Sequence, residues 1–311
     1  MAKNPSESLL AKLKNVSRET GIPMETAMRR YAYERLLALI CESEYRNDFC
    51  LKGGILLGAL FHSAFNRPTE DLDFNGMDSS LGIAHLAGAL QDLCSRHDGR
   101  DGLSFDIPSM RVLKDRDEMR VPGGKLLMLA NIGKARVRLT IDVGYGNPIT
   151  PSVRKMEFPT ILPSLLPPPV ITVYPPETTI AEKAHAMRRH GAFNTRIKDY
   201  FDIWCLSERF EFEGEDMAAA IRNTFEAHGD TIPDEFAALG QAFSASPQAQ
   251  RQWKTFTAAT GFGAEKTFTE VVEEVARFLY PAIAAANGGP PPGKWTPKEG
   301  WEPPSASMRL G

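Results

Sequence analysis

Residues 70–74 read Glu-Asp-Leu-Asp-Phe, so that carboxylates alternate with apolar side chains. This period of two predicts a β-strand, because successive side chains of a strand point to opposite faces. Asp71 and Asp73 therefore share one face, and Leu72 and Phe74 share the other. Paired carboxylates supply the oxygen ligands that Mg²⁺ prefers. An isolated Asp-x-Asp pair is also typical of a solvated edge strand, so the choice depends on the surrounding sequence.

A second alternating stretch, residues 136–143, carries a third carboxylate. Its apolar members fall on one face of the predicted strand and its polar members on the other: Val137, Leu139, Ile141 and Val143 against Arg136, Arg138, Thr140 and Asp142. Asp142 therefore lies on the polar face of a second strand. Carboxylates grouped in this way can hold the ions that clamp the attacking and leaving oxygens of a phosphoryl transfer.

A glycine pair precedes both strands. Lys52-Gly53-Gly54 follows the apolar stretch 49–51 and precedes the apolar, helical stretch 55–63, and residues 66–69 then predict a loop. Glycines at a helix start let the backbone approach a phosphate, although a glycine pair alone predicts only a turn. A glycine pair, then Asp-x-Asp, then a third Asp in a later strand is the order typical of the polymerase-β-like nucleotidyltransferase fold, a mixed sheet with flanking helices.

Composition divides the chain into two lobes of an α+β protein. Helical periodicity over 6–18 and 23–43 predicts N-terminal helices within 1–45, and a nucleotidyltransferase lobe is expected over 46–158. Seven prolines in 159–176 predict a connector, since proline at that density excludes a long helix. Residues 177–286 are expected to form a helical-bundle lobe. The Pro- and Gly-rich segment 287–311 is expected to be a disordered tail.

The expected helical lobe contributes a second charged cluster. Glu182 and Lys183 lie early in its first helix, and Arg196, Asp199 and Asp202 fall at i, i+3 and i+6 of the next. Residues at this spacing share one helix face. They suit a nucleotide site beside the hinge. The simpler alternative is a surface helix with an internal Arg–Asp pair, which contributes only a few tenths of a kcal/mol.

The 311 residues carry a net charge of −3, which excludes a uniformly basic coat protein for nucleic acid. The charge is unevenly distributed: residues 111–138 and 183–198 each carry a net +5, whereas 207–287 carry −7. Phosphate contacts dominate affinity for nucleic acids, so the basic segments supply candidate RNA-binding residues. These candidates are Arg111, Arg116, Arg120, Lys125, Arg188 and Arg189.

The sequence also carries information on the cellular compartment. The four cysteines form neither a metal-type spacing nor a disulfide framework. Residues 1–15 lack the apolar core of a signal peptide, and no stretch approaches the ~18 apolar residues of a spanning helix. These features predict a soluble, cytoplasmic protein without a membrane partner.

Six runs along the chain, taken in order, closely resemble the AbiEii/AbiGii toxin family of nucleotidyltransferases. They are ERLLALI (34–40), FCLKGGILL (49–57), RPTEDLDF (67–74), LTIDVGYG (139–146), YPPETTIAEKAHAM (174–187) and NTRIKDYFDIW (194–204). The resemblance spans about residues 28–206. Each run is modest, and the ordered set is specific.

The resemblance implies roles for individual residues. Asp71, Asp73 and Asp142 would bind the metal, Lys183 would bind the triphosphate, and Asp199 would be a further essential acid, so these are the expected catalytic residues. The expected nucleotide-binding residues are Lys52, Gly53, Gly54, Arg67, Thr69, Arg196, Lys198 and Asp202. Ile55 stands where many relatives have Ser or Thr, which removes one hydroxyl contact to phosphate.

The resemblance further implies transfer of a nucleoside monophosphate from a nucleoside triphosphate to an RNA acceptor, the 3′ end of tRNA. The cofactor would be Mg²⁺ (or Mn²⁺). The modification would block translation in toxin–antitoxin systems or abortive phage infection, under the control of a winged-helix DNA-binding antitoxin. Two alternatives stay open: a kinase-type phosphotransferase on the same fold, and a non-catalytic interaction protein. The intact Asp71, Asp73 and Asp142 argue against the second alternative.

Overall fold

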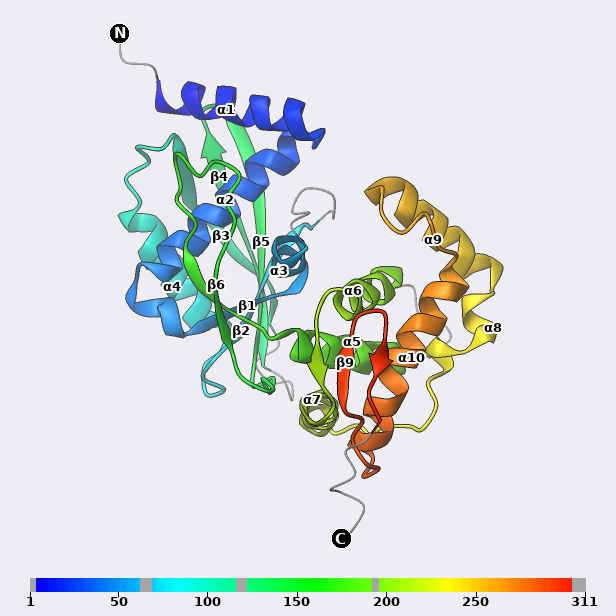
Figure 1. Ribbon diagram of the computed structural model, residues 1–311. Coiled ribbons are helices and arrows are strands. Elements are labelled where there is room, and N and C mark those ends of the chain that lie inside the picture. Colours follow the sequence, from blue (N-terminus) through cyan, green and yellow to red (C-terminus); the bar gives the residue numbers. More distant parts are fainter. Residues whose placement is uncertain (1–3, 62–68, 116–121, 192–195, 304–311) are drawn as a thin grey trace. The chain divides into compact units, whose positions relative to one another are not determined.

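The computed structural model describes residues 4–61, 69–115, 122–191 and 196–303. Its backbone contacts divide the chain into two compact units (Figure 1). The first unit comprises Met1–Asn147 and Arg154–Val173, and the second comprises Pro148–Val153 and Tyr174–Gly311. No helix among the described residues is long and apolar enough to cross a membrane.

A mixed seven-stranded sheet forms the centre of the first unit, in the order β3-β4-β5-β2-β1-β7-β6. β2 runs parallel to β5, and β1 runs parallel to β7, whereas the other neighbours are antiparallel. The strands are β1 (Phe49–Lys52), β2 (Asp71–Gly76), β3 (Leu103–Asp115), β4 (Gly123–Ile132), β5 (Ala135–Tyr145), β6 (Arg154–Glu157) and β7 (Val170–Val173).

Helices cover the apolar face of this sheet. α2 packs against β5, α4 packs against β3 and β4, and the two helices contact each other. They bury Leu139 and Ile141 of β5 completely, whereas Arg138 on the opposite face of the strand is exposed. The helices of this unit are α1 (Pro5–Thr20), α2 (Met24–Cys41), the 3₁₀ turn η1 (Glu44–Asn47), α3 (Gly53–Leu60) and α4 (Ile83–Arg96).

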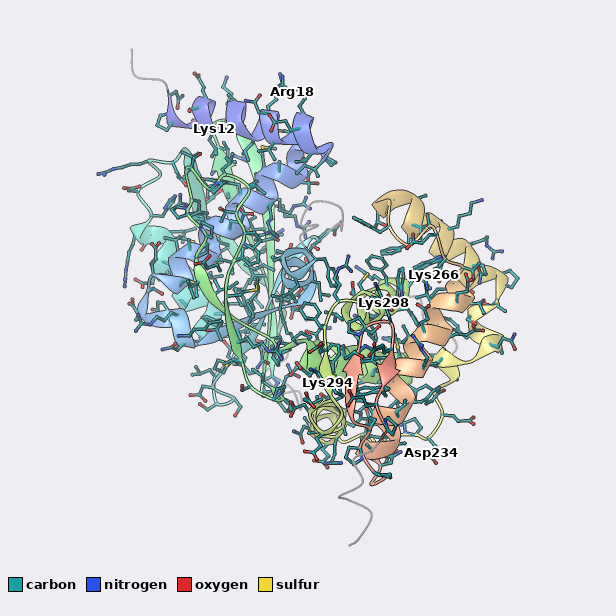
Figure 2. The ribbon with its side chains drawn as sticks, in the orientation of Figure 1. Lys12, Arg18, Asp234, Lys266, Lys294 and Lys298 are labelled. Atoms are coloured by element: carbon teal, nitrogen blue, oxygen red, sulfur yellow. The ribbon has the colours of Figure 1, made fainter. Side chains whose placement is uncertain are left out.

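Two helices, α1 and α2, lie in the segment where N-terminal helices were expected, and both belong to the first unit. α1 turns Leu9 and Leu13 inward and leaves Arg18 exposed (Figure 2). It begins at an Asn4 side-chain cap and ends at Gly21, whose left-handed backbone suits a helix C-terminus. The predicted loop at 66–69 lies, apart from Thr69, outside the described residues.

The Pro-rich segment 159–176 is more than a connector. Its residues 170–173 form β7, which pairs with both β1 and β6 inside the sheet. Its prolines are confined to the loop before β7 and to the start of α5, where proline is compatible with the backbone. The last passage of the chain from the first unit to the second therefore falls after Val173.

The second unit is mainly helical, as expected for residues 177–286. Its helices are α5 (Pro176–His190), α6 (Ile197–Ser207), α7 (Gly214–His228), the 3₁₀ turn η3 (Ala237–Leu239), α8 (Gln241–Ser244), α9 (Pro247–Thr260) and α10 (Phe268–Ala286). α10 packs against α6 and α7, and α5 packs against α7. All four tryptophans belong to this unit: Trp204, Trp253, Trp295 and Trp301.

The expectation of a disordered tail from residue 287 is wrong for the part of it that the structure describes. β9 (Lys294–Thr296) pairs with β8 (Phe212–Glu213) and β10 (Gly300–Trp301) in a small antiparallel sheet. Trp295 is 1% exposed, its ring packs against that of Phe278, and its indole N–H donates to the Ser207 carbonyl at 2.8 Å. Lys294 forms an ion pair with Glu211 (Figure 2). Aromatic burial thus overrides the Pro and Gly content of the segment.

Candidate active site

Four charged side chains form a row across the sheet of the first unit. The strand register places Lys125 of β4 opposite Asp142 of β5, Asp142 opposite Asp73 of β2, and Asp73 opposite Lys52 of β1. Residues directly opposite one another point to the same face of a sheet. Asp71 lies two residues before Asp73 and shares that face, opposite Thr140. The fold therefore brings Asp71, Asp73 and Asp142 together.

Lys125 is part of this row, although the sequence indicated it only as an RNA-binding candidate. Its Nζ lies 2.6 Å from Asp71 Oδ2 and 3.8 Å from Asp142 Oδ2. All three side chains are partly exposed, at 29%, 33% and 22%. An ammonium group at these distances offsets the repulsion between carboxylates, so Lys125 acts as an internal counter-ion of the cluster.

Asp73 has a raised pKa, at about 6. Burial is the main cause, and the nearby charges of Asp142 and Asp71 act in the same direction, whereas Lys52 and Lys125 lower the pKa. A divalent cation would relieve this crowding, and three carboxylates are the donor type that a hard cation prefers. In their present arrangement, no three His, Cys, Asp or Glu side chains in the described part of the chain could hold a metal ion. The three carboxylates are ligands of the right chemical type for a divalent cation, but such an ion would compete with the Lys125 ammonium for them.

The glycine pair lies directly against the carboxylates. Lys52 ends β1, and Gly53 and Gly54 begin α3. Gly53 has φ +74°, and a Cβ atom at this position would lie 2.0 Å from Asp73 Oδ2. Only glycine permits both this backbone conformation and this approach. Ile55 is 4% exposed, so it packs in the core instead of facing a ligand.

A tyrosine fixes the start of β2. The hydroxyl of Tyr33 on α2 lies 2.6 Å from the carbonyl oxygen of Glu70 and accepts the Thr140 N–H at 2.9 Å. Tyr33 is 1% exposed, and burial raises the pKa of its phenol. The hydroxyl therefore links β5 to the residue that precedes Asp71.

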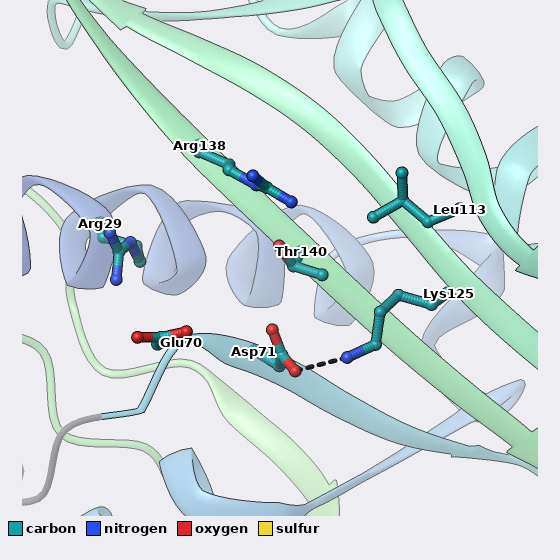
Figure 3. Close-up of a pocket in the computed structure, with 7 residues that line it drawn as sticks. All are labelled: Arg29, Glu70, Asp71, Leu113, Lys125, Arg138 and Thr140. Carbon is teal, nitrogen blue, oxygen red and sulfur yellow. Dashed lines mark hydrogen bonds and ion pairs between the residues drawn. The ribbon is translucent and has the colours of Figure 1, made fainter.

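A cavity of about 360 Å³ lies beside Asp71 (Figure 3). Charged and polar side chains from α2, β2, β4 and β5 form most of its wall. Its lining residues are Arg29, Glu70, Asp71, Leu113, Lys125, Arg138 and Thr140.

The charged cluster of the second unit is buried, so the interpretation as a surface helix is wrong. Lys183 Nζ lies 2.7 Å from both Asp199 Oδ1 and Asp202 Oδ2, and Arg196 Nε lies 2.6 Å from Asp199 Oδ2. The Asp199 and Asp202 side chains are 2% and 0% exposed. Burial raises the pKa of Asp199, but Lys183 and Arg196 outweigh it and lower this pKa to about 2. Buried carboxylates require such partners, which explains why a lysine from α5 meets two acids of α6.

The remaining predicted residues are scattered. Arg67, Arg116 and Arg120 lie outside the described residues, Thr69 lies just before β2, and Lys198 is exposed at the start of α6. Of the other basic candidates, Arg111 is exposed on β3, Arg189 is exposed on α5, and Arg188 lies 3.4 Å from Asp230.

Comparison with known proteins identifies the family. The chain matches the family described as "Nucleotidyl transferase AbiEii toxin, Type IV TA system" over residues 35–275, which is more than half of its length. The chain belongs to the AbiEii family. It is therefore a transferase, in a family of nucleotidyltransferase toxins from type IV toxin–antitoxin systems. A search of curated proteins finds no match.

Solved structures share the fold of this AbiEii protein at low sequence identity. MenT4, a nucleotidyltransferase toxin of Mycobacterium tuberculosis H37Rv, superposes with a TM-score of 0.51 at 17% identity, covering 88% of this chain and 98% of its own. JHP933 of Helicobacter pylori gives a TM-score of 0.50 at 16% identity, covering 86% of this chain and 95% of its own. These likenesses confirm the α+β nucleotidyltransferase fold.

Sequence reasoning missed Arg29 and Arg138 near the carboxylates of this AbiEii protein, and it indicated Lys125 only as an RNA-binding candidate. Lys125 faces the carboxylates themselves, and Arg29 and Arg138 line the adjacent cavity. A signal for Lys125 was present, because a hairpin turn at Gly133 sets Lys125 opposite Asp142. Arg138 has a signal too, since it shares the polar strand face with Asp142. Arg29 has none, because it comes from a helix distant in sequence.

Proposed function

We propose that this AbiEii protein transfers a nucleoside monophosphate from a nucleoside triphosphate to RNA, with the 3′ end of tRNA as the acceptor. The observation that carries the proposal is the group of three carboxylates on one sheet face, with Gly53 against Asp73. Family membership supports nucleotidyl transfer as the reaction class.

Asp71, Asp73 and Asp142 would hold Mg²⁺ (or Mn²⁺), which would supply positive charge against the phosphates and the displaced pyrophosphate. In the reaction, the acceptor hydroxyl oxygen forms a bond to the α-phosphorus, and the bond from this phosphorus to the β-phosphate bridging oxygen breaks. Asp142 accepts the proton of the attacking hydroxyl. Asp71 and Asp73 would position the substrate phosphates through the ion that they hold.

The glycine turn binds the triphosphate. The start of α3 at Gly53 and Gly54 presents backbone N–H groups beside Asp73, where a helix N-terminus favours anions. Lys52 lies in the same row and adds a positive charge. Thr69 lies just before β2 and is a candidate for a further phosphate contact. Within the second unit, Asp199 and Asp202 hold the Lys183 ammonium, and Arg196 pairs with Asp199.

The biological role follows from the reaction. A tRNA whose 3′ end carries an added nucleotide cannot be aminoacylated, so translation stops. Because tRNA is the acceptor, the enzyme acts in the cytoplasm. The antitoxin is a separately encoded winged-helix DNA-binding protein that restrains the toxin.

One assay tests the proposal. Purified protein is incubated with total tRNA, Mg²⁺ and each α- or γ-labelled triphosphate in turn, and label on RNA is measured. We expect α-label on tRNA. We expect Asp73→Asn to reduce it by about 100-fold or more, since a misplaced metal ligand disrupts the reacting geometry. Asp98→Asn, at an exposed carboxylate, is the control.

The alternatives give different results in the same assay. Label transferred only from the γ-position identifies a kinase-type phosphotransferase and refutes nucleotidyl transfer. No label from either position, together with growth inhibition that Asp73→Asn leaves unchanged, identifies a non-catalytic interaction protein.

A further inference from the structure

The cavity beside Asp71 continues the active-site face along β5. Arg138, Thr140 and Asp142 alternate on this strand and share its polar face, and the first two line the cavity. All of the lining residues belong to the first unit, and Figure 3 shows them around one space. The cavity is therefore adjacent to the carboxylates.

The cavity and the glycine turn lie on opposite sides of the carboxylates. Within the sheet, β1 adjoins one side of β2, and β5 adjoins the other, followed by β4 and β3. The glycine turn follows β1, whereas the cavity lies over β2, β5, β4 and β3. A triphosphate bound at the glycine turn therefore leaves the cavity to the other substrate.

The charges of the cavity suit a phosphate. Three cations, Arg29, Lys125 and Arg138, face two carboxylates, Glu70 and Asp71. The Lys125 ammonium donates a hydrogen bond to the Asp71 carboxylate. Arg29 contacts Glu25, whose side chain is 71% exposed, and Arg138 is exposed and forms no ion pair or hydrogen bond within the described part of the chain. The Arg138 guanidinium is thus available to an anion, whereas that of Arg29 would have to exchange its solvent-exposed partner Glu25 for the anion. Guanidinium matches phosphate with paired hydrogen bonds.

The cavity also offers an apolar surface. Leu113 lies in the exposed end of β3, is itself 42% exposed, and lines the cavity together with the arginines (Figure 3). An exposed apolar side chain beside cationic groups suits a nucleobase attached to a phosphate. The Thr140 hydroxyl and the Glu70 carboxylate add hydrogen-bonding groups for a ribose.

We infer that this cavity binds the terminal nucleotide of a single-stranded RNA 3′ end, with its phosphodiester on Arg29 and Arg138 and its base on Leu113. This inference rests on the proposed function, because it places the acceptor hydroxyl beside the carboxylates, of which Asp71 lines the cavity. The arginines bind the acceptor and not the triphosphate. They are positioning residues, since they hold RNA without touching the reacting phosphorus.

The experiment measures binding and catalysis separately. A fluorescent single-stranded RNA that ends in the tRNA 3′ sequence is titrated with wild-type protein, Arg29→Ala, Arg138→Ala and Arg136→Ala without triphosphate. Arg136 is exposed on the same face of β5 but does not line the cavity, so Arg136→Ala is the matched control. Steady-state KM values for RNA and for triphosphate are then measured for each variant.

We expect Arg29→Ala and Arg138→Ala each to weaken RNA binding by about tenfold, the effect of losing a charged hydrogen bond. Each should reduce the slope of log affinity against log salt by about 0.7. Each should also raise the KM for RNA at unchanged KM for triphosphate, and Arg136→Ala should change RNA affinity less than twofold. A higher KM for triphosphate alone would assign the cavity to the nucleotide and overturn the inference. An equal loss in Arg136→Ala would overturn it too, in favour of a diffuse basic surface.

Failure of the proposed function is distinguishable from failure of this inference. If wild-type protein transfers no nucleotide to RNA but binds it through Arg138, the proposed function fails and the cavity assignment stands. If transfer to tRNA occurs and neither arginine affects RNA binding, the assignment fails and the proposed function stands.

Discussion

Replacing Gly53 by alanine should disable the enzyme while leaving it folded. Gly53 combines a left-handed backbone, φ +74°, with direct contact to Asp73. A Cβ atom would lie 2.0 Å from Asp73 Oδ2 and 2.8 Å from Asp73 Cβ. Rotation of the carboxylate can relieve the first contact but not the second, because Cβ does not move with the side-chain torsion. The backbones of β1 and β2 must therefore separate.

The predicted effect of Gly53→Ala has two parts, a loss of stability and a loss of reaction rate. The left-handed conformation costs an L-residue about 1–2 kcal/mol. The contact with Asp73 adds a displacement, since 2.8 Å is well short of the about 3.5–4.0 Å that carbon atoms prefer. The displacement moves Asp73 away from its place opposite Asp142. A misplacement approaching 1 Å at a reacting centre costs about 100-fold in rate.

Gly21→Ala separates the two parts. Gly21 has φ +76°, and a Cβ atom there would meet nothing within 4 Å. Thermal unfolding should show a loss of stability in both variants, larger in Gly53→Ala because only there does a Cβ atom meet a neighbour. Nucleotide transfer to RNA and Mn²⁺ affinity should fall only in Gly53→Ala. If the transfer rate of Gly53→Ala stayed within about threefold of that of Gly21→Ala, the close approach of Gly53 to Asp73 would not be required for catalysis.

Three further variants test other parts of the molecule. Lys183→Met leaves two buried carboxylates without their shared cation. Urea denaturation followed by tryptophan fluorescence should show that the free energy of unfolding falls by about 3–5 kcal/mol. The control Lys198→Met, at an exposed lysine, should change it little. Burial raises the pKa of Asp101, but hydrogen bonds and the Arg35 charge bring it to about 2, below its ordinary value of 3.8. The ionised form of Asp101 therefore stabilises the fold above about pH 4. The difference in unfolding free energy between wild type and Asp101→Asn should shrink as the pH falls from about 4 to about 2. A difference that stays constant over this range would contradict the lowered pKa of Asp101. Thr267→Ala removes the capping box of α10 and should cost about 1 kcal/mol, whereas Thr267→Ser should retain it.

The carboxylate strands could be predicted from the sequence because their signal is local. Alternation over 70–74 and 136–143 fixes which side chains share a face, and the structure has both strands. The order of the strands in the sheet, in contrast, depends on contacts between distant parts of the chain. Asp73 meets Asp142 only because β2 pairs with β5, and no local pattern specifies a pairing between segments so distant in sequence.

Tertiary partners explain where the sequence interpretation failed. Asp199 and Asp202 fit a solvated helix face when only α6 is considered, and they are buried because Lys183 of α5 compensates their charge. The segment from residue 287 has the composition of a tail. Its two tryptophans were the missed signal, since Trp295 and Trp301 both pack on Phe278 of α10.

The interleaving of the two units has a consequence for how the toxin is made. The chain passes between them three times, after Asn147, Val153 and Val173. During synthesis, the sheet with the carboxylate row can close once residue 173 has left the ribosome. The second unit closes only when β9 arrives to pair with β8 and bury Trp295. A nascent chain therefore carries a finished carboxylate row well before the unit that contains Lys183 can fold, which delays a complete toxin until β9 has been translated.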